Sequence, residues 1–520
     1  MIIITVNRAE YEYDIYGLVQ AFYRHEPIEI RYDVTCADRL PYQTRKHVLK
    51  RENGGDGLPN EGISSLRVTY DSHSFSLEWT GAHAGDSPYK VFEKYPDSWG
   101  SDPEKNKNYR LLLKNLLKRE IYKILSKSCG QTLPWGTLTG IRPVKISLDM
   151  LERGAGRDRI ESRMSDEYLV SKEKTDLSID IAIREKKILD GIDTKKGVSV
   201  YIGIPFCPTT CLYCSFDSMP RYGNDDLVSE YLSALKKEIR WTGEYIKEIG
   251  HIDTVYIGGG TPTALTSDEL SDLLEYSRSA LPMDKALEFT VEAGRPDSIT
   301  REKLSVMKEY GVTRISVNPQ TMNQKTLDLI GRRHTVEQFT ASYYLAREMG
   351  FQNINMDLIL GLPGENVADV EYTMKRISEM RPDDLTIHSL AIKTKSRLNI
   401  EWEKYKNYAM ENSTALMDAA RNAAESMGLF PYYLYRQKNM IGNLENTGYA
   451  LPGKEGIYNI LIMEEKESII ACGAGTVSKR VPKDTSGSQI RRCDTVRDVR
   501  TYIERIEEMI DRKRKLFSKG

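Results

Sequence analysis

The sequence has few histidines, no excess of basic residues and no long apolar run. Histidine accounts for seven of the 520 residues. The 74 lysine and arginine residues are balanced by 75 aspartate and glutamate residues, which gives a formal net charge of −1. A general nucleic-acid-binding protein would carry a basic excess, and a membrane-spanning helix would need a run of about 18 apolar residues. We therefore expect neither nucleic-acid binding nor a membrane span.

The marks of a secreted protein are also missing. The first residues, MIIITVNRAEYEYD, have no basic segment followed by a long apolar core, so they do not resemble a signal peptide. The odd number of cysteines, seven, does not suggest a disulfide framework in so long a chain. We expect a cytoplasmic protein in which the scattered cysteines are buried thiols. These are Cys36, Cys129, Cys472 and Cys493.

The chain is too long for one hydrophobic core, and its pattern changes near residues 190 and 400. Residues 1–190 indicate an N-terminal α+β domain. Residues 64–79 alternate between apolar and polar, which predicts paired strands. Residues 108–125 predict an amphipathic helix with a leucine stripe and lysines opposite, most simply a solvated face. A second predicted helix, 176–189, leads into a linker at 190–197.

Residues 198–400 repeat a strand followed by a helix six times. Apolar strand segments such as VSVYIGIPF alternate with helical segments such as DDLVSEYLSALKKEI. This alternation predicts a parallel sheet covered by helices. Six units fit an incomplete (β/α)6 barrel, so the predicted fold class is α/β with the active site at the C-terminal strand ends. The conspicuous glycine and polar motifs all follow predicted strands.

Residues 401–520 predict a small C-terminal α+β domain that covers the substrate. A helical segment begins near residue 399, and residues 456–465 and 468–475 read as strands. Residues 495–517 predict one amphipathic helix with Val499, Ile503, Ile506 and Ile510 on one face. We expect this helix to pack on the barrel or on a second subunit.

Three cysteines follow the first predicted barrel strand, in the pattern Cys207-x3-Cys211-x2-Cys214. Thiolates are ligands for zinc and for iron–sulfur clusters. Structural zinc normally takes four ligands, but only three cysteines cluster here and no histidine is near. Three thiolates on a four-iron cubane leave one iron open to bind a further ligand. The pattern therefore favours a [4Fe-4S] cluster over a zinc or purely structural site.

Other strand ends carry polar residues or glycines. The second strand ends in GGGTP at 258–262, where glycines allow a ligand to approach the backbone. Glu292 ends the third strand, Gln320 follows the fourth, and Arg332 is expected on the next helix. Asp357 lies inside an apolar strand, where a carboxylate is costly without a partner. We predict that these residues meet at the barrel mouth.

The cysteine spacing, with Tyr213 before the third cysteine, resembles the radical S-adenosylmethionine (SAM) superfamily. The resemblance implies that the open iron binds the amino and carboxylate groups of SAM. It implies that the reduced cluster splits SAM into methionine and a 5′-deoxyadenosyl radical, while the protein positions the cofactor. The GGGTP loop, Glu292, Gln320, Arg332 and residues 357–364 (DLILGLPG) are similar to the oxygen-independent coproporphyrinogen III oxidase (dehydrogenase) family. The segment WGTLTGIRP at 135–143 resembles its HemZ-type branch.

The resemblance implies a set of site residues and partners. The cluster ligands and catalytic centre would be Cys207, Cys211 and Cys214. The SAM-binding residues would be Tyr201, Tyr213, Gly259, Gly260, Thr261, Glu292, Gln320, Arg332, Asp357 and Ala391. Tyr213 would shield the cluster or contact adenine. One or two molecules of SAM, a tetrapyrrole substrate and an electron donor such as flavodoxin or ferredoxin are implied as well.

The implied reaction is the oxidative decarboxylation of coproporphyrinogen III to protoporphyrinogen IX in heme biosynthesis. A tetra-anionic substrate needs cations near the barrel mouth. The candidates are Arg295, Arg314, Arg332, Arg333, Lys393 and Lys395. Two alternatives stay open. One is a heme chaperone, which would need a histidine or cysteine as axial ligand, and the other is a different radical SAM reaction on a tetrapyrrole.

Three positions depart from the family pattern. Phe216 stands where some members have a further cysteine, and Gly203 stands where the family often has histidine. The segment 473–478 reads GAGTVS where the family often has Gly-x-Gly-Ala-His-Ser. These departures concern the substrate rather than the radical chemistry.

Overall fold

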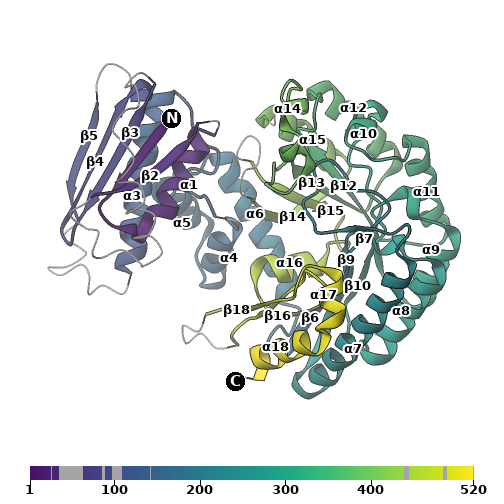
Figure 1. Cartoon of the computed structure of the whole chain (residues 1–520). Helices are drawn as coiled ribbons and strands as arrows, with labels where there is room; N and C mark the ends of the chain where they lie inside the picture. Colours follow the sequence, from purple (N-terminus) through teal and green to yellow (C-terminus); the bar gives the residue numbers. More distant parts are fainter. Residues whose placement is uncertain are drawn as a thin grey trace. The chain divides into compact units, whose positions relative to one another are not determined.

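The computed structural model describes residues 1–24, 26–33, 62–84, 88–95, 108–140, 142–410, 413–437, 444–483 and 489–518. Cys36, expected as a buried thiol, lies outside these residues. The chain divides into two compact units (Figure 1). They are Met1–Gly140 with Arg153–Ile179, and Ile141–Glu152 with Asp180–Gly520. The described part of 401–520 belongs to the same unit as the barrel, which differs from the expected separate C-terminal domain.

The first unit is built on a five-stranded sheet in the order β2-β1-β3-β4-β5. Its strands are β1 (Ile2–Val6), β2 (Ile28–Tyr32), β3 (Ser64–Tyr70), β4 (Ser74–Gly81) and β5 (Tyr89–Lys94). The predicted paired strands at 64–79 are confirmed, because β3 and β4 form an antiparallel pair. The predicted helix is α3 (Tyr109–Cys129), whose leucine stripe is buried together with residues of helix α1 (Glu12–Phe22). Its lysine face is not wholly solvated, because Lys118 is buried and donates to Thr139 Oγ1 at 2.9 Å.

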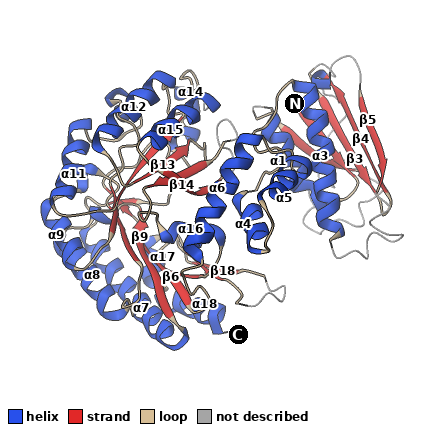
Figure 2. Ribbon diagram, turned by 180° about the vertical axis from the view of Figure 1, so that it is seen from behind, coloured by secondary structure: helices blue, strands red, loops and turns tan. Residues whose placement is uncertain are grey.

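The second unit contains the six predicted parallel strands, which are neighbours in chain order. They are β6 (Gly197–Ile204), β9 (His251–Gly259), β10 (Glu288–Glu292), β11 (Arg314–Ser316), β12 (Ile354–Leu360) and β13 (Asp384–Ser389). The covering helices are α7 (Asp225–Ile249), α8 (Ser267–Ala280), α9 (Arg301–Glu309), α10 (Gln324–Leu329), α11 (Val336–Glu348) and α12 (Val367–Met380). Figure 2 shows these helices around the outside of the curved sheet. The strands are almost wholly buried, as expected for a parallel sheet covered by helices.

Residues 430–494 extend this sheet at both ends to eleven strands. At one end, β15 (Asn446–Ala450) pairs antiparallel with β13 and carries β14 (Phe430–Tyr435) beside it. At the other end, β16 (Ser468–Cys472) pairs parallel with β6, so a late segment flanks the first barrel strand. The hairpin strands β17 (Val477–Arg480) and β18 (Arg491–Asp494) follow it.

Two predictions for this region are wrong. Residues 456–465, expected as a strand, contain helix α16 (Ile457–Glu464), whose buried side chains are Tyr458, Ile460, Leu461 and Glu464. A short apolar run does not distinguish a strand from a buried helix by its periodicity. The helical segment expected from residue 399 is divided among α13 (Arg397–Ile400), α14 (Trp402–Tyr405) and α15 (Thr414–Ser426).

The C-terminal tail packs on the barrel, as predicted, but as two helices. Helices α17 (Val499–Glu504) and α18 (Ile506–Ser518) meet at Arg505, and both contact α7. A buried ion pair attaches α18 to α7, in which Lys513 Nζ donates to Glu238 Oε1. Glu238 also accepts hydrogen bonds from Tyr502 at 2.6 Å and from the Gly473 amide at 2.7 Å. Among the described helices, none is both long and apolar enough to cross a membrane.

The Lys513–Glu238 pair gives a stability prediction. Lys513→Met leaves a buried carboxylate without its counter-charge, so we expect the free energy of unfolding to fall by about 3–5 kcal/mol. Urea unfolding measures the change. Lys515→Met, on the exposed side of the same helix, should change stability by less than about 0.5 kcal/mol. Equal effects of the two variants would show that the buried pair is not what holds the tail.

Candidate functional site

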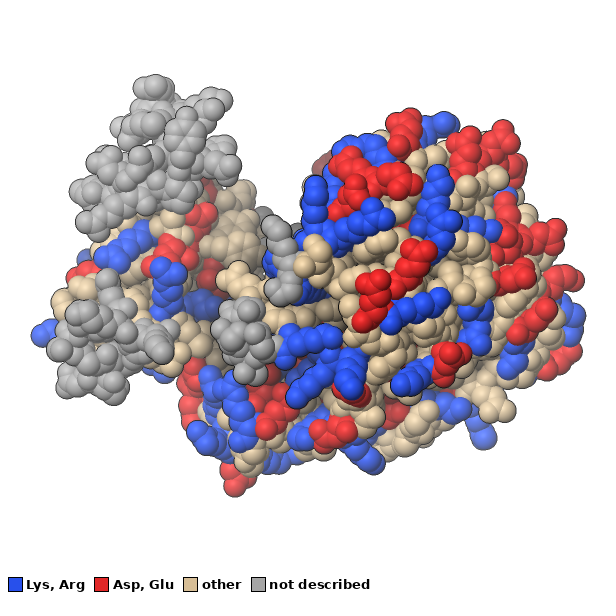
Figure 3. Space-filling model, turned by 90° about the horizontal axis from the view of Figure 1, so that it is seen from below, with Lys and Arg blue, Asp and Glu red and all other residues tan. Residues whose placement is uncertain are grey.

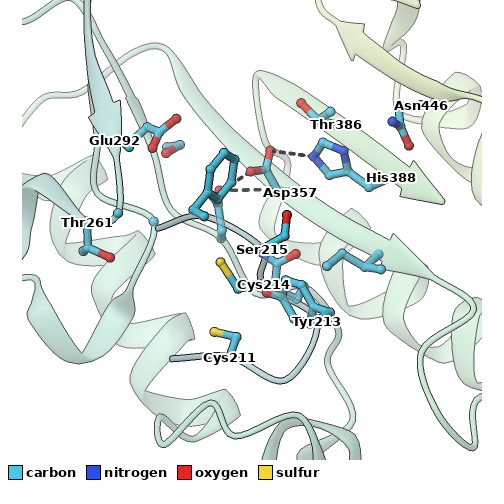
Figure 4. A pocket seen from close by; sticks show the side chains of 18 of the residues that line it. Cys211, Tyr213, Cys214, Ser215, Thr261, Glu292, Asp357, Thr386, His388 and Asn446 are labelled. Atoms are coloured by element: carbon cyan, nitrogen blue, oxygen red, sulfur yellow. Dashed lines mark hydrogen bonds and ion pairs between the residues drawn. The ribbon is translucent and has the colours of Figure 1, made fainter. Parts of the chain in front are cut away.

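A cavity of about 490 Å³ in the second unit brings the predicted site residues together. It is lined by all three clustered cysteines and by every residue expected to bind SAM: Tyr201, Tyr213, Gly259, Gly260, Thr261, Glu292, Gln320, Arg332, Asp357 and Ala391. In the view of Figure 4, Cys211 and Cys214 lie at one end, His388 and Asn446 at the other, and Asp357 between them. The C-terminal strand ends meet here, as the fold predicts.

The cysteine end of the cavity is a loop between two short strands, β7 (Phe206–Cys207) and β8 (Met219–Pro220). Hydrogen-bond donors reach two of its sulfurs. Thr261 Oγ1 lies 3.4 Å from Cys207 Sγ, and Arg295 Nη1 lies 3.5 Å from Cys211 Sγ. A side chain at Gly260 would come within 2.9 Å of Cys207 Sγ, so this position requires glycine. Such donors stabilise negative charge on sulfur.

The three cysteines of this loop are suited to hold a cluster, because three thiolates suffice for a four-iron cubane. A zinc site needs its ligands about 2.0–2.3 Å from one ion, whereas the three thiolates of a cubane each bind a different iron and need not converge. Burial raises the pKa of Cys214 to about 11, so binding of the metal must displace the thiol proton.

Glu292 is held at the end of β10 beside a stack of tyrosines. Tyr256 donates to Glu292 Oε1 at 2.7 Å, and its ring stacks on Tyr458 at 4.6 Å between centroids. Tyr201 stacks on both rings, at 6.0 and 6.3 Å. Burial raises the pKa of Glu292 to about 7, although the Tyr256 hydroxyl opposes this shift. Near neutral pH this carboxyl therefore exchanges readily between its acid and its anion.

Asp357 has a different environment, although it is equally enclosed. Asn318 and Asn355 donate to its two oxygens at 2.7 and 2.8 Å, and His388 Nε2 lies 3.8 Å away. Burial alone would raise the pKa of Asp357, but these neighbours hold it below the usual value. Tyr435 contacts the other ring nitrogen of His388 at 3.3 Å. Asp357 is therefore a stable anion, because its buried carboxylate has the hydrogen-bond partners expected for a charge inside an apolar strand.

Gln320 carries backbone strain and an unpaired polar atom. Its φ is +67°, in the left-handed region that residues other than glycine rarely adopt. Its backbone pairs with β12. The Gln320 amide donates to the Asp357 carbonyl at 2.9 Å, and the Gln320 carbonyl accepts from the Ile359 amide at 2.9 Å. Its side-chain Oε1 is buried without a hydrogen-bond partner in the described structure. A buried acceptor of this kind in a cavity wall is suited to bind a donor on a ligand.

Arg332 differs from the prediction in its position and in its contacts. It lies in the connection between α10 and α11, not on a helix. Its guanidinium donates to the carbonyls of Gly294 and Asn318, both at 2.7 Å, and to the Tyr213 hydroxyl at 3.3 Å. These bonds brace two strand ends against the cysteine loop, where Tyr213 lies.

The other candidate cations divide into two groups. Three of them line the cavity: Arg295, which is paired with Asp297, Arg314, which is paired with Asp384, and Lys393. Arg333 is exposed, and Lys395 forms a surface ion pair with Asp217. Figure 3 shows lysine and arginine interspersed with acidic residues on the surface of this unit, as the balanced charge implies.

Two of the three departures from the family pattern lie in contact with each other. A Cβ at Gly203 would come within 2.7 Å of the Thr476 side chain. A histidine at 203 and a threonine at 476 therefore do not fit together without rearrangement. Phe216, the third departure, lines the cavity and is 70% exposed.

The sequence does not predict the wall opposite the cysteines. It comes from β13, β14, β15 and α16. Its residues are His388, Tyr433, Tyr435, Asn446, Tyr458, Asn459, Ile462 and Met463. A signal existed for His388, which is a polar residue in an otherwise buried strand. The α16 residues give none, because the apolar run of this segment predicts a strand.

Comparison with known proteins assigns the class first. A three-cysteine loop at the end of the first strand of a parallel, helix-covered sheet defines a radical SAM protein, and the profile of the Radical SAM superfamily matches residues 201–377. The solved structure of coproporphyrinogen III oxidase (HemN) from Escherichia coli has a similar fold, with a TM-score of 0.50 and 21% identity. The match covers 62% of this chain and 73% of HemN.

Curated relatives then identify the family. The chain is 42% identical over 404 residues to the oxygen-independent coproporphyrinogen-III oxidase-like protein HemZ of Bacillus subtilis (strain 168), covering 77% of this chain and 80% of HemZ. It is 32% identical to the heme chaperone HemW of the same organism, over 53% of this chain and 69% of HemW. This chain belongs to the oxygen-independent coproporphyrinogen III oxidase family of radical SAM proteins, in its HemZ-type branch.

The cysteine loop predicts how iron is bound. Protein reconstituted anaerobically with iron and sulfide should carry about four irons per chain, and Cys207→Ala, Cys211→Ala or Cys214→Ala should abolish the cluster's electron paramagnetic resonance signal. Cys129→Ala, in the first unit, is the control and should load fully. Zinc retained in place of iron after reconstitution would contradict the assignment.

The raised pKa of Glu292 predicts a pH dependence of stability. A carboxyl whose pKa is about 7 when folded and 4.5 when unfolded favours folding at low pH. This contribution is lost as the pH rises from about 4.5 through about 7. Urea unfolding of the metal-free protein should therefore show a decline over this range that Glu292→Gln reduces. Glu302→Gln, an exposed carboxylate, should leave the decline unchanged, and identical profiles for both variants would contradict the prediction.

Proposed function

We propose that this protein is an oxygen-independent coproporphyrinogen III oxidase, which converts two propionates of coproporphyrinogen III to the vinyl groups of protoporphyrinogen IX in heme biosynthesis. The proposal depends on one observation, the continuous cavity that joins the cysteine loop to a wall of tyrosine and asparagine side chains from residues 430–463. Its volume of about 490 Å³ lies in the usual range for small-molecule sites. The similarity to HemZ supports the same substrate class.

The chain's own residues would bind and orient the reactants. Cys207, Cys211 and Cys214 would hold the [4Fe-4S] cluster, and the glycine loop with Glu292, Gln320 and Asp357 would hold one or two molecules of SAM. When SAM is bound and the cluster is reduced by a donor such as flavodoxin or ferredoxin, the cluster and SAM together supply a 5′-deoxyadenosyl radical. The protein must then keep the reacting carbon in contact with that radical and keep water away from it.

In the proposed reaction, each propionate would lose a hydrogen atom from its β-carbon, and this atom would complete 5′-deoxyadenosine. The bond between the α-carbon and the carboxylate then breaks, which releases CO2 and forms the vinyl double bond. One electron passes to a one-electron acceptor. The tyrosine-rich wall, which has no acidic side chain among its named residues, would face the macrocycle without repelling its carboxylates.

A heme chaperone is the second candidate function. Two observations favour it: the 32% identity to HemW, and the position of His388 in the cavity wall. An imidazole there could serve as an axial ligand for heme iron. His388→Ala should then weaken heme binding, whereas an oxidase need not bind heme at all.

The proposed reaction predicts a labelled product. With reductant, SAM and coproporphyrinogen III, cluster-loaded protein should release CO2 and form protoporphyrinogen IX, methionine and 5′-deoxyadenosine. Deuterium on the propionate β-carbon should appear in the 5′-deoxyadenosine, as measured by mass spectrometry. Cys211→Ala should give none of these products.

A different result would favour the chaperone. Suppose that cluster-loaded protein cleaves SAM and binds heme tightly, yet leaves coproporphyrinogen III unchanged with several electron donors. The oxidase proposal is then wrong.

A further inference from the structure

Lys393 differs from the other cationic side chains that line the cavity. Each of the arginines there already has an acceptor: Asp297 for Arg295, Asp384 for Arg314 and backbone carbonyls for Arg332. Within the described part of the chain, the Lys393 ammonium has no hydrogen bond or ion pair. Of these four lining cations, it is therefore the one whose donors are all available to a ligand.

The backbone places Lys393 at the cysteine end of the cavity. Its carbonyl accepts hydrogen bonds from the amide of Ser396 at 2.9 Å and from its hydroxyl at 2.7 Å, which form a tight turn after β13. Ser396 is fully buried and caps α13. The Leu398 amide then donates at 2.9 Å to Leu212, between two of the clustered cysteines. The turn is thus fixed against the cysteine loop.

The surroundings of the ammonium favour an anionic partner. Burial lowers the pKa of Lys393, and the nearby Cys214 opposes this shift. A partly buried charge without a partner is costly, and a charge-assisted hydrogen bond to a carboxylate offsets that cost. Lys395, two residues further along, has no such need, because it pairs with Asp217 at 2.9 Å on the surface.

We propose that Lys393 binds a carboxylate of a ligand held in the cavity beside the cysteine loop. Two ligands carry that group: SAM, on its methionine part, and a tetrapyrrole, on its propionates. The tetrapyrrole source rests on the proposed function, whereas the SAM source does not. Lys393 would be a specificity-determining residue, because it would favour a ligand with a free carboxylate over the same ligand without that carboxylate.

The test uses full-length, cluster-loaded protein and matched ligands. The variants are Lys393→Met, which keeps an unbranched side chain out to Cε and removes the charged nitrogen, and Lys395→Met as the control. One arm measures dissociation constants for coproporphyrin III and its tetramethyl ester by fluorescence. The other measures those for SAM and decarboxylated SAM by calorimetry. Iron content and circular dichroism confirm that each variant is folded and loaded.

Loss of a charge-assisted bond should weaken binding of the acid form by about tenfold or more. The matching ligand without the carboxylate should be affected by less than about twofold, and Lys395→Met should match the parent in all four measurements. A selective loss in the porphyrin arm identifies a propionate as the partner. A selective loss in the SAM arm identifies the amino-acid carboxylate.

Two results would overturn the proposal. One is unchanged binding of both acids by folded, loaded Lys393→Met protein. The other is an equal loss for the acids and their carboxylate-free partners together with a shifted cluster reduction potential, which would mean that Lys393 neutralises the cluster alone. If the parent protein binds neither porphyrin, the SAM arm decides the role of Lys393, and turnover of coproporphyrinogen III decides the proposed function separately.

Discussion

The buried ion pair between Arg314 and Asp384 connects the strands of the barrel to the helix that completes the cavity. Arg314 begins β11, Asp384 begins β13, and both are almost inaccessible to solvent. Tyr432 of β14 also donates to Asp384, at 2.9 Å, and Asn459 of α16 donates to Tyr432 at 3.3 Å. Burial raises the pKa of Asp384 to about 6, against the effect of Arg314. A charge pair so deeply buried tolerates little displacement, because separating the two ions would leave each charge buried without a counter-charge. The hydrogen bonds through Tyr432 fix α16 to this pair.

The two carboxylates of the cavity, Glu292 and Asp357, differ in pKa because their neighbouring side chains differ. Glu292 has one hydroxyl donor and a pKa raised to about 7 by burial. Asp357 has two amide donors and a nearby imidazole, and its pKa is lowered despite the burial that would raise it. At neutral pH one group can exchange a proton and the other remains an anion. Pairs of acids with separated pKa values are a common means of assigning acid and base roles within one site.

Much of the barrel and of its cofactor side could be predicted from sequence, for physical reasons. Strands buried on both faces leave continuous apolar runs, and polar residues that interrupt or end such runs stand out, as Asp357 and Glu292 do. The wall opposite the cysteines could not be predicted in this way. The apolar residues of α16 fit a strand as well as a helix, and its Tyr458 lines the cavity through contacts with Tyr201 and Tyr256, which are distant in sequence. The closeness of Gly203 and Thr476 depends on the pairing of β6 with β16, which the local pattern does not encode.

The pairing of β16 with β6 also sets an order for assembly. Val198 and Ser468 are partners in the register, although about half of the chain lies between them. During synthesis, β6 and its cysteine loop leave the ribosome long before β16 is made. Until then one edge of β6 has unpaired backbone groups, which are prone to associate with other chains. Because non-local strand pairing is slow, the strand that supports the cysteine loop completes its sheet late, and a nascent chain exposes this edge until its C-terminal part arrives.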